Sequence, residues 1–300
     1  MPESGAFAEC PLPALSQRWV PSPRRLTTLN RRFHAMLDLS AARDLIANAK
    51  RIVVLTGAGI SAESGVPTFR GEGGLWKNFR AEDLATPEAF ARDPAFVWEW
   101  YRWRQALVAR CLPNEAHHAL TDLAIRRAGV TIITQNVDGL HARAAYDVAP
   151  VADPAPALPI ELHGSLFRSR CVACGALSDS GPVDDVDIPA APIADDAESP
   201  SAHRACCTDC DGAIRPDVVW FGEMLDPAII GKAQQLSSEA DVCLVIGTSG
   251  LVHPAAGLAF LTKQSGGAVI EVNPEPTPIT DIATISIRGT AVDVVPALVL

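Results

Sequence analysis

The feature that most constrains the fold is the stretch of residues 52–71, where a short apolar run is followed at once by glycines. Residues 52–55 are β-branched or otherwise apolar, and the pattern stops at Gly57. A short run of this kind is typical of a buried parallel strand that leads into a tight turn. We therefore expect a strand to end here and a candidate phosphate site to begin.

The turn has the spacing of a phosphate-binding loop. Gly57, Gly59 and Ala62 fit the pattern G-x-G-x-x-G/A. In that pattern the first glycine permits the turn, the second lets backbone N–H groups approach a pyrophosphate, and the third small residue lets a following helix pack on the strand. On this pattern alone, a glycine-rich turn without a ligand is an equally good explanation.

The residues beyond the turn favour a ligand. Pro67 and the glycines near it favour a loop over a longer helix, and this loop carries Phe69 and Arg70. An aromatic ring and an arginine beside a phosphate cradle suit stacking on a ring and pairing with an anion. A dehydrogenase would place a second strand and then an acidic residue about 20 residues further on. No β-rich run stands there, so the chain departs from the dehydrogenase pattern.

Three later apolar runs, residues 130–134, 242–246 and 268–272, also lead into small or hydrogen-bonding residues. In a doubly wound sheet the ligand binds at the carboxyl ends of the parallel strands, so four such runs predict one crevice in an α/β fold with a Rossmann-like sheet. Ordinary structural turns remain the alternative. The residues that follow the three runs are Gln135, Asn136, Val137 and Asp138, then Gly247, Thr248 and Ser249, then Asn273, Pro274 and Glu275.

Helical patterns occupy much of the remaining chain. A helix capped by Ser40 is expected to lead into the first strand. Residues 72–114 contain no convincing strand and are expected to form a helical insertion, with one helix from Pro94 that stops at Pro113 and a second helix over 115–127. The apolar face of the first helix carries Ala42, Leu45, Ile46 and Ala49.

Composition excludes some classes of function. A 300-residue chain that is 48% hydrophobic can build a substantial core, and no apolar run approaches the roughly 20 residues that span a bilayer. The net charge of −10 argues against a large nucleic-acid surface, because phosphate contacts need clustered Lys and Arg. A partner with basic segments suits this charge better.

The first 37 residues show no sustained period, and we expect a poorly ordered extension before a catalytic domain over residues 38–300. Five arginines with no acidic residue between Glu9 and Asp38 resemble an organelle transit peptide. The alternative is that Met36 is the natural start. We expect a cytoplasmic location, with the mitochondrial matrix as the alternative. The arginines are Arg18, Arg24, Arg25, Arg31 and Arg32.

Five of the eight cysteines cluster between Cys171 and Cys210, which indicates a metal site in a reducing compartment. Two C-x-x-C knuckles can present four thiolates to one tetrahedral ion, so we expect one structural zinc in a module over about 168–214. Cys206 could replace Cys207, although the spacing favours Cys207, and a redox dithiol is the other alternative. The acidic loop over 181–201 is expected to be a mobile insertion. The four predicted ligands are Cys171, Cys174, Cys207 and Cys210.

Candidate catalytic groups precede this module. His163 adjoins Gly164, which permits close approach of a ligand, but a lone histidine is more often structural. His141, Asp138 and Asn136 form a second polar group. The chain has neither a G-x-S-x-G elbow nor an H-E-x-x-H helix, so serine hydrolase and zincin functions lack support.

Together these motifs resemble the sirtuins, a family of NAD-dependent protein lysine deacylases, in the right order over about residues 40–298. The motifs include residues 57–71, the run Thr-Gln-Asn-Val-Asp-Gly-Leu-His, the two knuckles, and Arg-Pro-Asp-Val-Val-Trp-Phe-Gly-Glu over 215–223. The resemblance implies that NAD is surrounded by Gly57, Ala58, Gly59, Ser61, Ala62, Glu63, Pro67, Thr68, Phe69, Arg70, Trp76, Gln135, Asn136, Val137, Asp138, Gly247, Thr248, Ser249, Asn273, Pro274, Glu275 and Ala291.

The resemblance also implies roles in the reaction. His163 takes the place of the general base, and Asn136 and Asp138 position ribose and nicotinamide. Free lysine, nicotinamide and 2′-O-acyl-ADP-ribose would be the products. The substrate peptide would lie as an added strand on a wall formed by Val219, Trp220, Phe221 and Glu223.

Tyr101 and Arg104 stand three residues apart and share a helix face, and with the small Ala85 they resemble the class III branch of the family, the desuccinylases and demalonylases. A guanidinium and a phenol can bind the acyl carboxylate that acetyl lacks. An aromatic core stripe with a surface arginine is the alternative. We therefore expect a preference for succinyl-, malonyl- or glutaryl-lysine and a monomer. The other functions considered are plain deacetylation, ADP-ribosyl transfer and NAD sensing without turnover.

Overall fold

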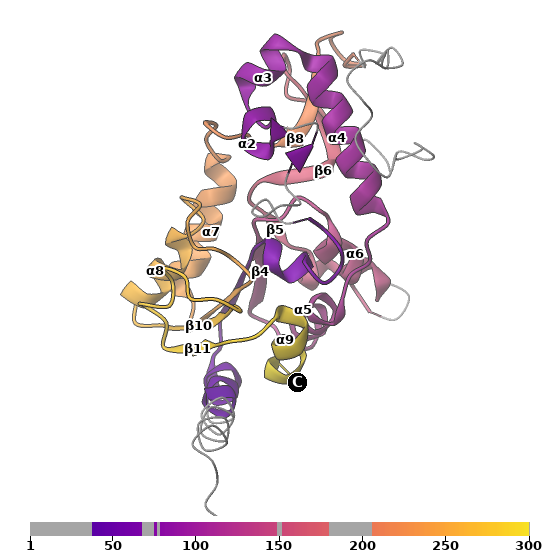
Figure 1. Cartoon of the computed structure of the whole chain (residues 1–300). Helices are drawn as coiled ribbons and strands as arrows, with labels where there is room; N and C mark the ends of the chain where they lie inside the picture. Colours follow the sequence, from indigo (N-terminus) through magenta and orange to yellow (C-terminus); the bar gives the residue numbers. More distant parts are fainter. Residues whose placement is uncertain (1–37, 68–74, 77–78, 149–151, 180–205, 300) are drawn as a thin grey trace, which may run out of the picture.

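A six-stranded parallel sheet forms the centre of the molecule (Figure 1). The computed structural model describes residues 38–67, 75–76, 79–148, 152–179 and 206–299. All five neighbouring strand pairs are parallel. The strand order is β11-β10-β9-β1-β4-β5, with β1 Ile52–Thr56, β4 Val130–Thr134, β5 Ile160–Glu161, β9 Val242–Ile246, β10 Ala268–Val272 and β11 Ile285–Ile287.

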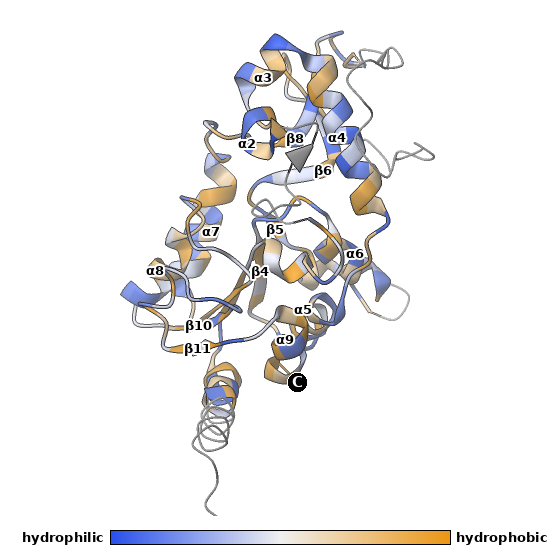
Figure 2. Cartoon of the chain, viewed as in Figure 1, coloured by the Kyte–Doolittle hydropathy of each residue, from blue (hydrophilic) through white to orange (hydrophobic). Residues whose placement is uncertain are grey.

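Helices cover both faces of this sheet, as a doubly wound fold requires. One core lies under the helix over residues 38–48, α5 (Glu115–Arg126) and α9 (Ala291–Val299). The other lies under α7 (Pro227–Glu239) and α8 (Gly257–Gln264). The strands alternate between the two, since Val54 of β1 joins the first core and its neighbours Val53 and Leu55 join the second. In Figure 2 strands β10 and β11 are orange and the outer end of α8 is blue.

A second body packs beyond the carboxyl ends of the strands (Figure 1). It combines a three-stranded antiparallel sheet in the order β7-β6-β8 with several helices and has its own apolar core, in which α4 contributes Val97, Trp100 and Tyr101. Its elements are β6 Gly164–Cys171, β7 Leu177–Asp179, β8 Ile214–Val218, α2 Ala81–Leu84, α3 Pro87–Arg92 and α4 Pro94–Ala109, and α6 Leu140–Asp147 joins it to the large sheet.

The four predicted strands are confirmed, but the sequence missed β5 and β11, which are only two and three residues long. The expectation that residues 72–114 contain no strand is wrong, because β2 (Leu75–Trp76) and β3 (Phe79–Arg80) pair as a short antiparallel ribbon. Ser40 is not a helix cap, since the backbone is already helical at residue 38. The limits predicted for the domains stay predictions.

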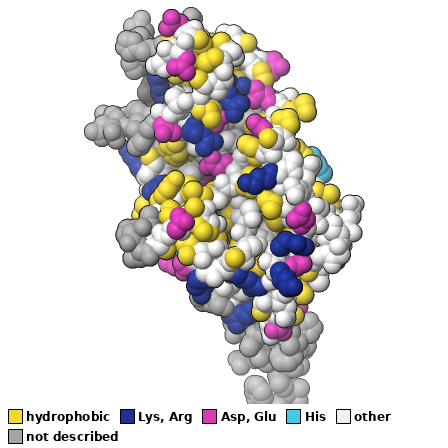
Figure 3. Space-filling model, turned by 180° about the vertical axis from the view of Figure 1, so that it is seen from behind, with side chains coloured by type: hydrophobic (Ala, Val, Ile, Leu, Met, Phe, Trp, Pro, Cys, Tyr) yellow, Lys and Arg dark blue, Asp and Glu magenta, His cyan; other side chains and the backbone are white. Residues whose placement is uncertain are grey.

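Among the described residues, no helix is long and apolar enough to cross a membrane. On the face shown in Figure 3, acidic and basic side chains are interspersed with apolar ones. The predicted extension over 1–37 and the acidic loop over 181–201 lie outside the described residues.

Candidate active site

The loops at the carboxyl ends of β1, β9 and β10 are bonded to one another through their backbones. The N–H of Gly57 donates to the carbonyl of Ile246 at 3.1 Å, and that of Gly59 donates to Gly247 at 2.8 Å. The N–H of Gly247 in turn donates to Val272 at 3.0 Å. The predicted loops therefore converge at one edge of the sheet, which we call the nucleotide edge and define as residues 57–61, 135–138, 247–249 and 273–275.

The glycines of this edge are required by the contact between two loops. A Cβ on Gly59 would lie 2.7 Å from the Cα of Gly247, and one on Gly57 would lie 2.8 Å from the Cβ of Thr248. The expected role of Ala62 is wrong, because Ala62 is exposed. In the described stretch over residues 57–67 the chain forms only a single 3-10 turn, η1 (Ala58–Ser61), with no longer helix for Ala62 to pack.

Asn136 and Asp138 are buried where β4 ends. The amide of Asn136 donates to the carbonyl of Gly57 and to Oγ of Ser61, each at 3.2 Å. With both N–H groups engaged, the carbonyl oxygen Oδ1 is the atom of this side chain left to meet a ligand. One carboxylate oxygen of Asp138 accepts the N–H of Leu140 at 2.9 Å. Burial raises the pKa of Asp138, and that hydrogen bond is the first of several contacts that oppose the rise.

His163 stands at the junction between the large sheet and the second body. Its Nδ1 lies 2.8 Å from the carbonyl oxygen of Gln135, which can only accept, so Nδ1 carries the proton. Burial lowers the pKa of His163, although the hydrogen bond to Gln135 acts in the opposite direction. The ring is therefore neutral near pH 7 and presents the lone pair of Nε2.

Behind these groups lie two buried histidines. Nε2 of His141 lies 3.0 Å from Oγ1 of Thr56, and Nε2 of His117 lies 3.4 Å from Oγ of Ser61. The two rings meet edge to face at 4.8 Å. Burial lowers the pKa of His117 to about 2 and that of His141 to about 4. His141 supports β1 from behind, and the sequence analysis missed His117, whose place within an ordinary helical pattern carried no signal.

The remaining loops of the nucleotide edge are joined by side chains. The amide of Asn273 donates to the carbonyl of Thr248 at 2.7 Å, and the amide of Gln135 donates to Oγ1 of Thr248 at 3.0 Å. Pro274 and Glu275 are exposed, whereas Ala291 is buried at the start of α9. Ala58, Val137 and Ser249 lie on the same loops, and Glu63 and Pro67 follow η1 on the surface.

A buried carboxylate, which the sequence analysis missed, holds the loop after β10. Glu271 is 1% exposed and accepts hydrogen bonds from Thr277 at 2.5 Å and Thr280 at 2.7 Å, and also from Ser286. Arg288 pairs with Glu271 at 3.1 Å and donates to the carbonyl of Glu275 at 2.9 Å. Burial acts to raise the pKa of Glu271, but these partners outweigh it and lower the pKa. Glu271 therefore fixes the shape of residues 273–280.

The predicted acyl-reading residues belong to the core of the second body. Tyr101 is fully buried, and its hydroxyl accepts the indole N–H of Trp220 at 2.8 Å. Arg104 is half-buried, with its Cζ 5.2 Å from the ring centroid of Trp100. Burial raises the pKa of Tyr101 to about 12, although the positive charge of Arg104 opposes the rise. Ala85 is buried at the end of α2.

The four residues predicted to contact the peptide lie in the segment after β8 and differ in exposure. Phe221 is 47% exposed and Val219 is partly buried, and their N–H groups donate to the carbonyls of Ala85 and His163, both at 2.9 Å. Trp220 is only 3% exposed, and the carboxylate of Glu223 is paired with Arg215. The indole of Trp220 therefore turns toward the protein and the carboxylate of Glu223 is held by Arg215, and the predicted peptide wall stays a prediction.

The four predicted metal ligands come together. The Sγ atoms of Cys171, Cys174, Cys207 and Cys210 all lie within 4.8 Å of one another, while the exposed Cys206 lies outside this group. Four convergent thiols fit a tetrahedral zinc with no open position, which is a structural site.

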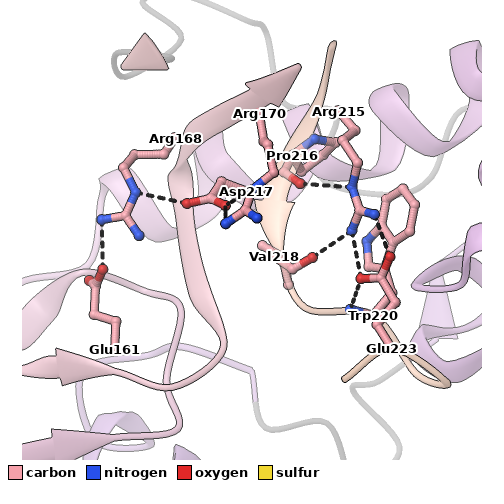
Figure 4. Close-up of polar contacts among 9 residues, drawn as sticks. All are labelled: Glu161, Arg168, Arg170, Arg215, Pro216, Asp217, Val218, Trp220 and Glu223. Carbon is pink, nitrogen blue, oxygen red and sulfur yellow. Dashed lines mark hydrogen bonds and ion pairs between the residues drawn. The ribbon is translucent and has the colours of Figure 1, made fainter. Parts of the chain in front are cut away.

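Ion pairs tie this module to the large sheet (Figure 4). Arg168 of β6 pairs with Asp217 of β8 at 2.9 Å and with Glu161 of β5 at 2.8 Å, and Arg170 pairs with Asp217 at 2.8 Å. The pKa of Glu161 is raised, first by burial and also by the nearby carboxylates of Asp217 and Asp138, although Arg168 opposes the rise. The zinc module is therefore anchored beside the turn between β5 and β6 that carries His163.

Several predicted cofactor contacts were not located. Thr68, Phe69 and Arg70 lie outside the described residues. For Trp76 the structure describes only the backbone, in β2.

Comparison with known proteins reveals close relatives. Residues 57–254 match the model of the Sir2 family. The chain is 48% identical over 257 residues to NAD-dependent protein deacylase 2 of Pyrobaculum aerophilum, covering 85% of this chain and 92% of that one. A Sir2 homolog solved as an NAD complex superposes with a TM-score of 0.72 at 44% identity, covering 87% and 92% of the two chains. A Sir2 variant solved with a deacetylated p53 peptide and 3′-O-acetyl ADP ribose has a TM-score of 0.67 at 31% identity, covering 86% and 96%.

Proposed function

The chain belongs to the Sir2 family, and from this premise we propose that it is an NAD-dependent protein lysine deacylase that prefers succinyl, malonyl or glutaryl groups to acetyl. The relatives named above support the NAD-dependent deacylase activity, and the solved peptide complex supports an acylated protein substrate. The acyl preference rests on the residues of the second body.

The donors and acceptors of the nucleotide edge fit NAD. Loops rich in backbone N–H groups suit its phosphates, and the amides of Gln135 and Asn273 and the exposed carboxylate of Glu275 suit its ribose hydroxyls. When bound, NAD supplies a ribose carbon that becomes electrophilic as nicotinamide leaves. Asn136 offers Oδ1 from a fixed position, because its amide nitrogen is held by Gly57 and Ser61. Preorganised groups of this kind lower the cost of orienting the reactants.

We assign the general base to Nε2 of His163. Nδ1 is held by the carbonyl of Gln135, so only Nε2 can accept a proton from a ribose hydroxyl. The lowered pKa of His163 keeps this atom unprotonated at neutral pH. The backbone of the same residue accepts the N–H of Val219, which places the base beside the segment where the peptide would lie.

The proposed acyl preference is supported by one observation about the buried hydroxyl of Tyr101. In its hydrogen bond this hydroxyl is the acceptor and not the donor. Trp220 donates to it, so the phenolic proton itself has no acceptor among the described residues. Arg104 is the charged group that acts most strongly on Tyr101, and a guanidinium also only donates. A phenolic proton and a guanidinium charge in the same core suit an anion, and the acyl carboxylate of succinyl-lysine supplies one.

The test is steady-state deacylation, with NAD, of one peptide carrying acetyl-, malonyl-, succinyl- or glutaryl-lysine. We expect the acidic acyl groups to exceed acetyl in kcat/KM by tenfold or more, about 1.4 kcal/mol. If acetyl is the better substrate, the chain is a deacetylase of the same fold. ADP-ribose attached to protein without any deacylated peptide would instead support ADP-ribosyl transfer.

A further inference from the structure

The hydroxyl of Tyr101 is hydrogen-bonded to a residue that is distant in the sequence. Its partner Trp220 is 119 positions later, on the segment after β8, and both side chains are buried. An indole N–H can donate and cannot accept, so it occupies a lone pair of the phenol oxygen and leaves the phenolic proton to point elsewhere. Without this indole, the hydroxyl could rotate and use its proton in other directions.

Trp220 is itself held on several sides (Figure 4). The guanidinium of Arg215 lies against the indole, with its Cζ 3.3 Å from the ring centroid, and the ring of Phe90 lies at 5.2 Å. The backbone N–H of Trp220 donates to Glu223 at 2.8 Å. Neither the plane nor the direction of the indole is free to change.

Arg215 binds the residues on both sides of Trp220 in the segment after β8. Its two terminal nitrogens bind both carboxylate oxygens of Glu223, at 2.5 and 2.9 Å, and one of them also donates to the carbonyl of Val218 at 2.8 Å. A bidentate pair of this kind fixes geometry as well as adding energy. The burial of Glu223 acts to raise its pKa, but Arg215 together with the backbone N–H of Trp220 and the charge of Arg170 outweighs this, so the pKa is lowered and the pair stays charged.

We propose that Trp220 is a specificity-determining positioning residue, which orients the Tyr101 hydroxyl so that its proton meets the acyl carboxylate, and that Arg215 with Glu223 holds Trp220 for this task. This inference rests on the proposed preference for acidic acyl groups. It gives Trp220, whose indole is turned toward Tyr101 and Arg215, a part in the reading of the acyl group. The exposed Phe221 adjoins Trp220, so the same segment serves the peptide and the acyl group.

The experiment is a double-mutant cycle of Trp220→Phe and Tyr101→Phe, scored as the ratio of kcat/KM for succinyl- and acetyl-lysine peptides. A ratio within each variant cancels general losses of activity. We expect Trp220→Phe to lower the ratio about fivefold, the effect of one net hydrogen bond, and Tyr101→Phe to lower it at least as much. In the Tyr101→Phe background Trp220→Phe should change the ratio less than twofold, since no hydroxyl remains to orient.

Trp98→Phe is the matched control. Trp98 lies on the same helix as Tyr101 and donates its indole N–H to the carbonyl of Ile214 at 3.1 Å, at the start of β8. The substitution removes one indole hydrogen bond between that helix and the β8 region without touching Tyr101. We expect the ratio of wild-type protein to be kept within about twofold.

Two further measurements test the role of Trp220 without relying on the turnover of Trp220→Phe alone. The dissociation constants of the succinyl and acetyl peptides, measured by fluorescence anisotropy without NAD, should shift in the same ratio, independently of turnover. If Trp220→Phe fails to fold, Arg215→Lys replaces it, because lysine keeps the charge but loses the flat contact and the bidentate pair. We expect Arg215→Lys to lower the ratio as well.

The outcomes separate this proposal from the proposed function. If wild-type protein shows no preference for succinyl, the proposed function fails and the inference fails with it. If the preference exists but Trp220→Phe leaves the ratio unchanged, or lowers it equally with and without the Tyr101 hydroxyl, only the inference is overturned. An equal loss in Trp98→Phe would also overturn it, because the effect would then be general packing.

Discussion

The nucleotide edge differs in its contacts from the part of the second body that we call the acyl-reading end, defined as Ala85, Tyr101, Arg104 and Trp220. The loops of the nucleotide edge follow strands that pair in parallel and in register, and backbone hydrogen bonds join them. The acyl-reading end depends on single side-chain contacts between distant segments, such as that between Tyr101 and Trp220. The frame of the nucleotide edge is thus set mainly by strand pairing, whereas the acyl preference proposed above rests on a few side-chain atoms.

Loss of the metal should give the largest difference in effect between the two regions. Cys207→Ser removes one of four thiolates, and metal binding is a large part of the folding free energy of such modules, on the order of 10 kcal/mol. We expect loss of zinc, loss of deacylation of every acyl peptide, and NAD binding that persists on the large sheet, measured by metal analysis and calorimetry. Cys206→Ser is the control. A Cys207→Ser protein that keeps zinc and activity would refute the ligand assignment.

Loss of the proposed base, His163, should lower the turnover of every acyl peptide by the same factor. In His163→Asn the amide nitrogen can replace Nδ1 in the bond to Gln135, but no atom replaces Nε2. We expect kcat to fall roughly 10²- to 10⁴-fold for succinyl and acetyl peptides equally, with peptide affinity little changed. Rates within tenfold of wild type would remove His163 from the base role.

Arg104→Met should damage the acyl-reading end alone. Loss of a charged hydrogen-bond donor should cost about 2 kcal/mol in transition-state binding for succinyl-lysine, roughly thirtyfold in kcat/KM, and far less for acetyl-lysine. Arg102→Met on the same helix is the control, since Arg102 lies 6.0 Å from the ring of Trp98. Equal losses on the two substrates would defeat the specificity assignment.

Glu271→Gln should damage the nucleotide edge alone. A neutral amide cannot accept every bond that the carboxylate accepts, so the loop that carries Asn273 and Glu275 loses its fixed shape. We expect KM for NAD to rise about fivefold, about 1 kcal/mol, by the same factor for every acyl peptide. Glu239→Gln, at an exposed position on α7, is the control. A change in acyl preference would show that the two regions are not independent.

The smallest effect concerns the histidines behind the nucleotide edge. The pKa of His141 is about 4 in the folded protein and about 6.5 when unfolded, so the unfolded state binds more protons below pH 6.5. The free energy of unfolding should therefore fall as the pH drops from 6.5 toward 4. Between pH 7 and 5.5 the loss should be about 1 kcal/mol smaller in His141→Gln than in wild type, measured by urea unfolding. Identical pH dependence would contradict a neutral buried His141.

Some features were predictable because their signals are local. The strand that ends before Gly57, the apolar run over 242–246 and the two cysteine knuckles each carry their pattern within a few residues. Strands β5 and β11 carried no such pattern, because two or three residues are too few to show a period. Tyr101 and Arg104 were found through a family resemblance, and their helical spacing alone is equally typical of a core stripe.

Periodicity and residue type were thus enough to establish a doubly wound sheet with its ligand loops at one edge and a module held by four thiols, since backbone pairing and metal coordination need only the right residues in order. The direction of single side chains needed the folded chain. Trp220 turns inward because Arg215 lies against its ring and Tyr101 accepts its N–H, and His117 supports Ser61 across 56 positions. Contacts of this kind join segments that no local pattern relates, and they decide which face of a residue the substrate can reach.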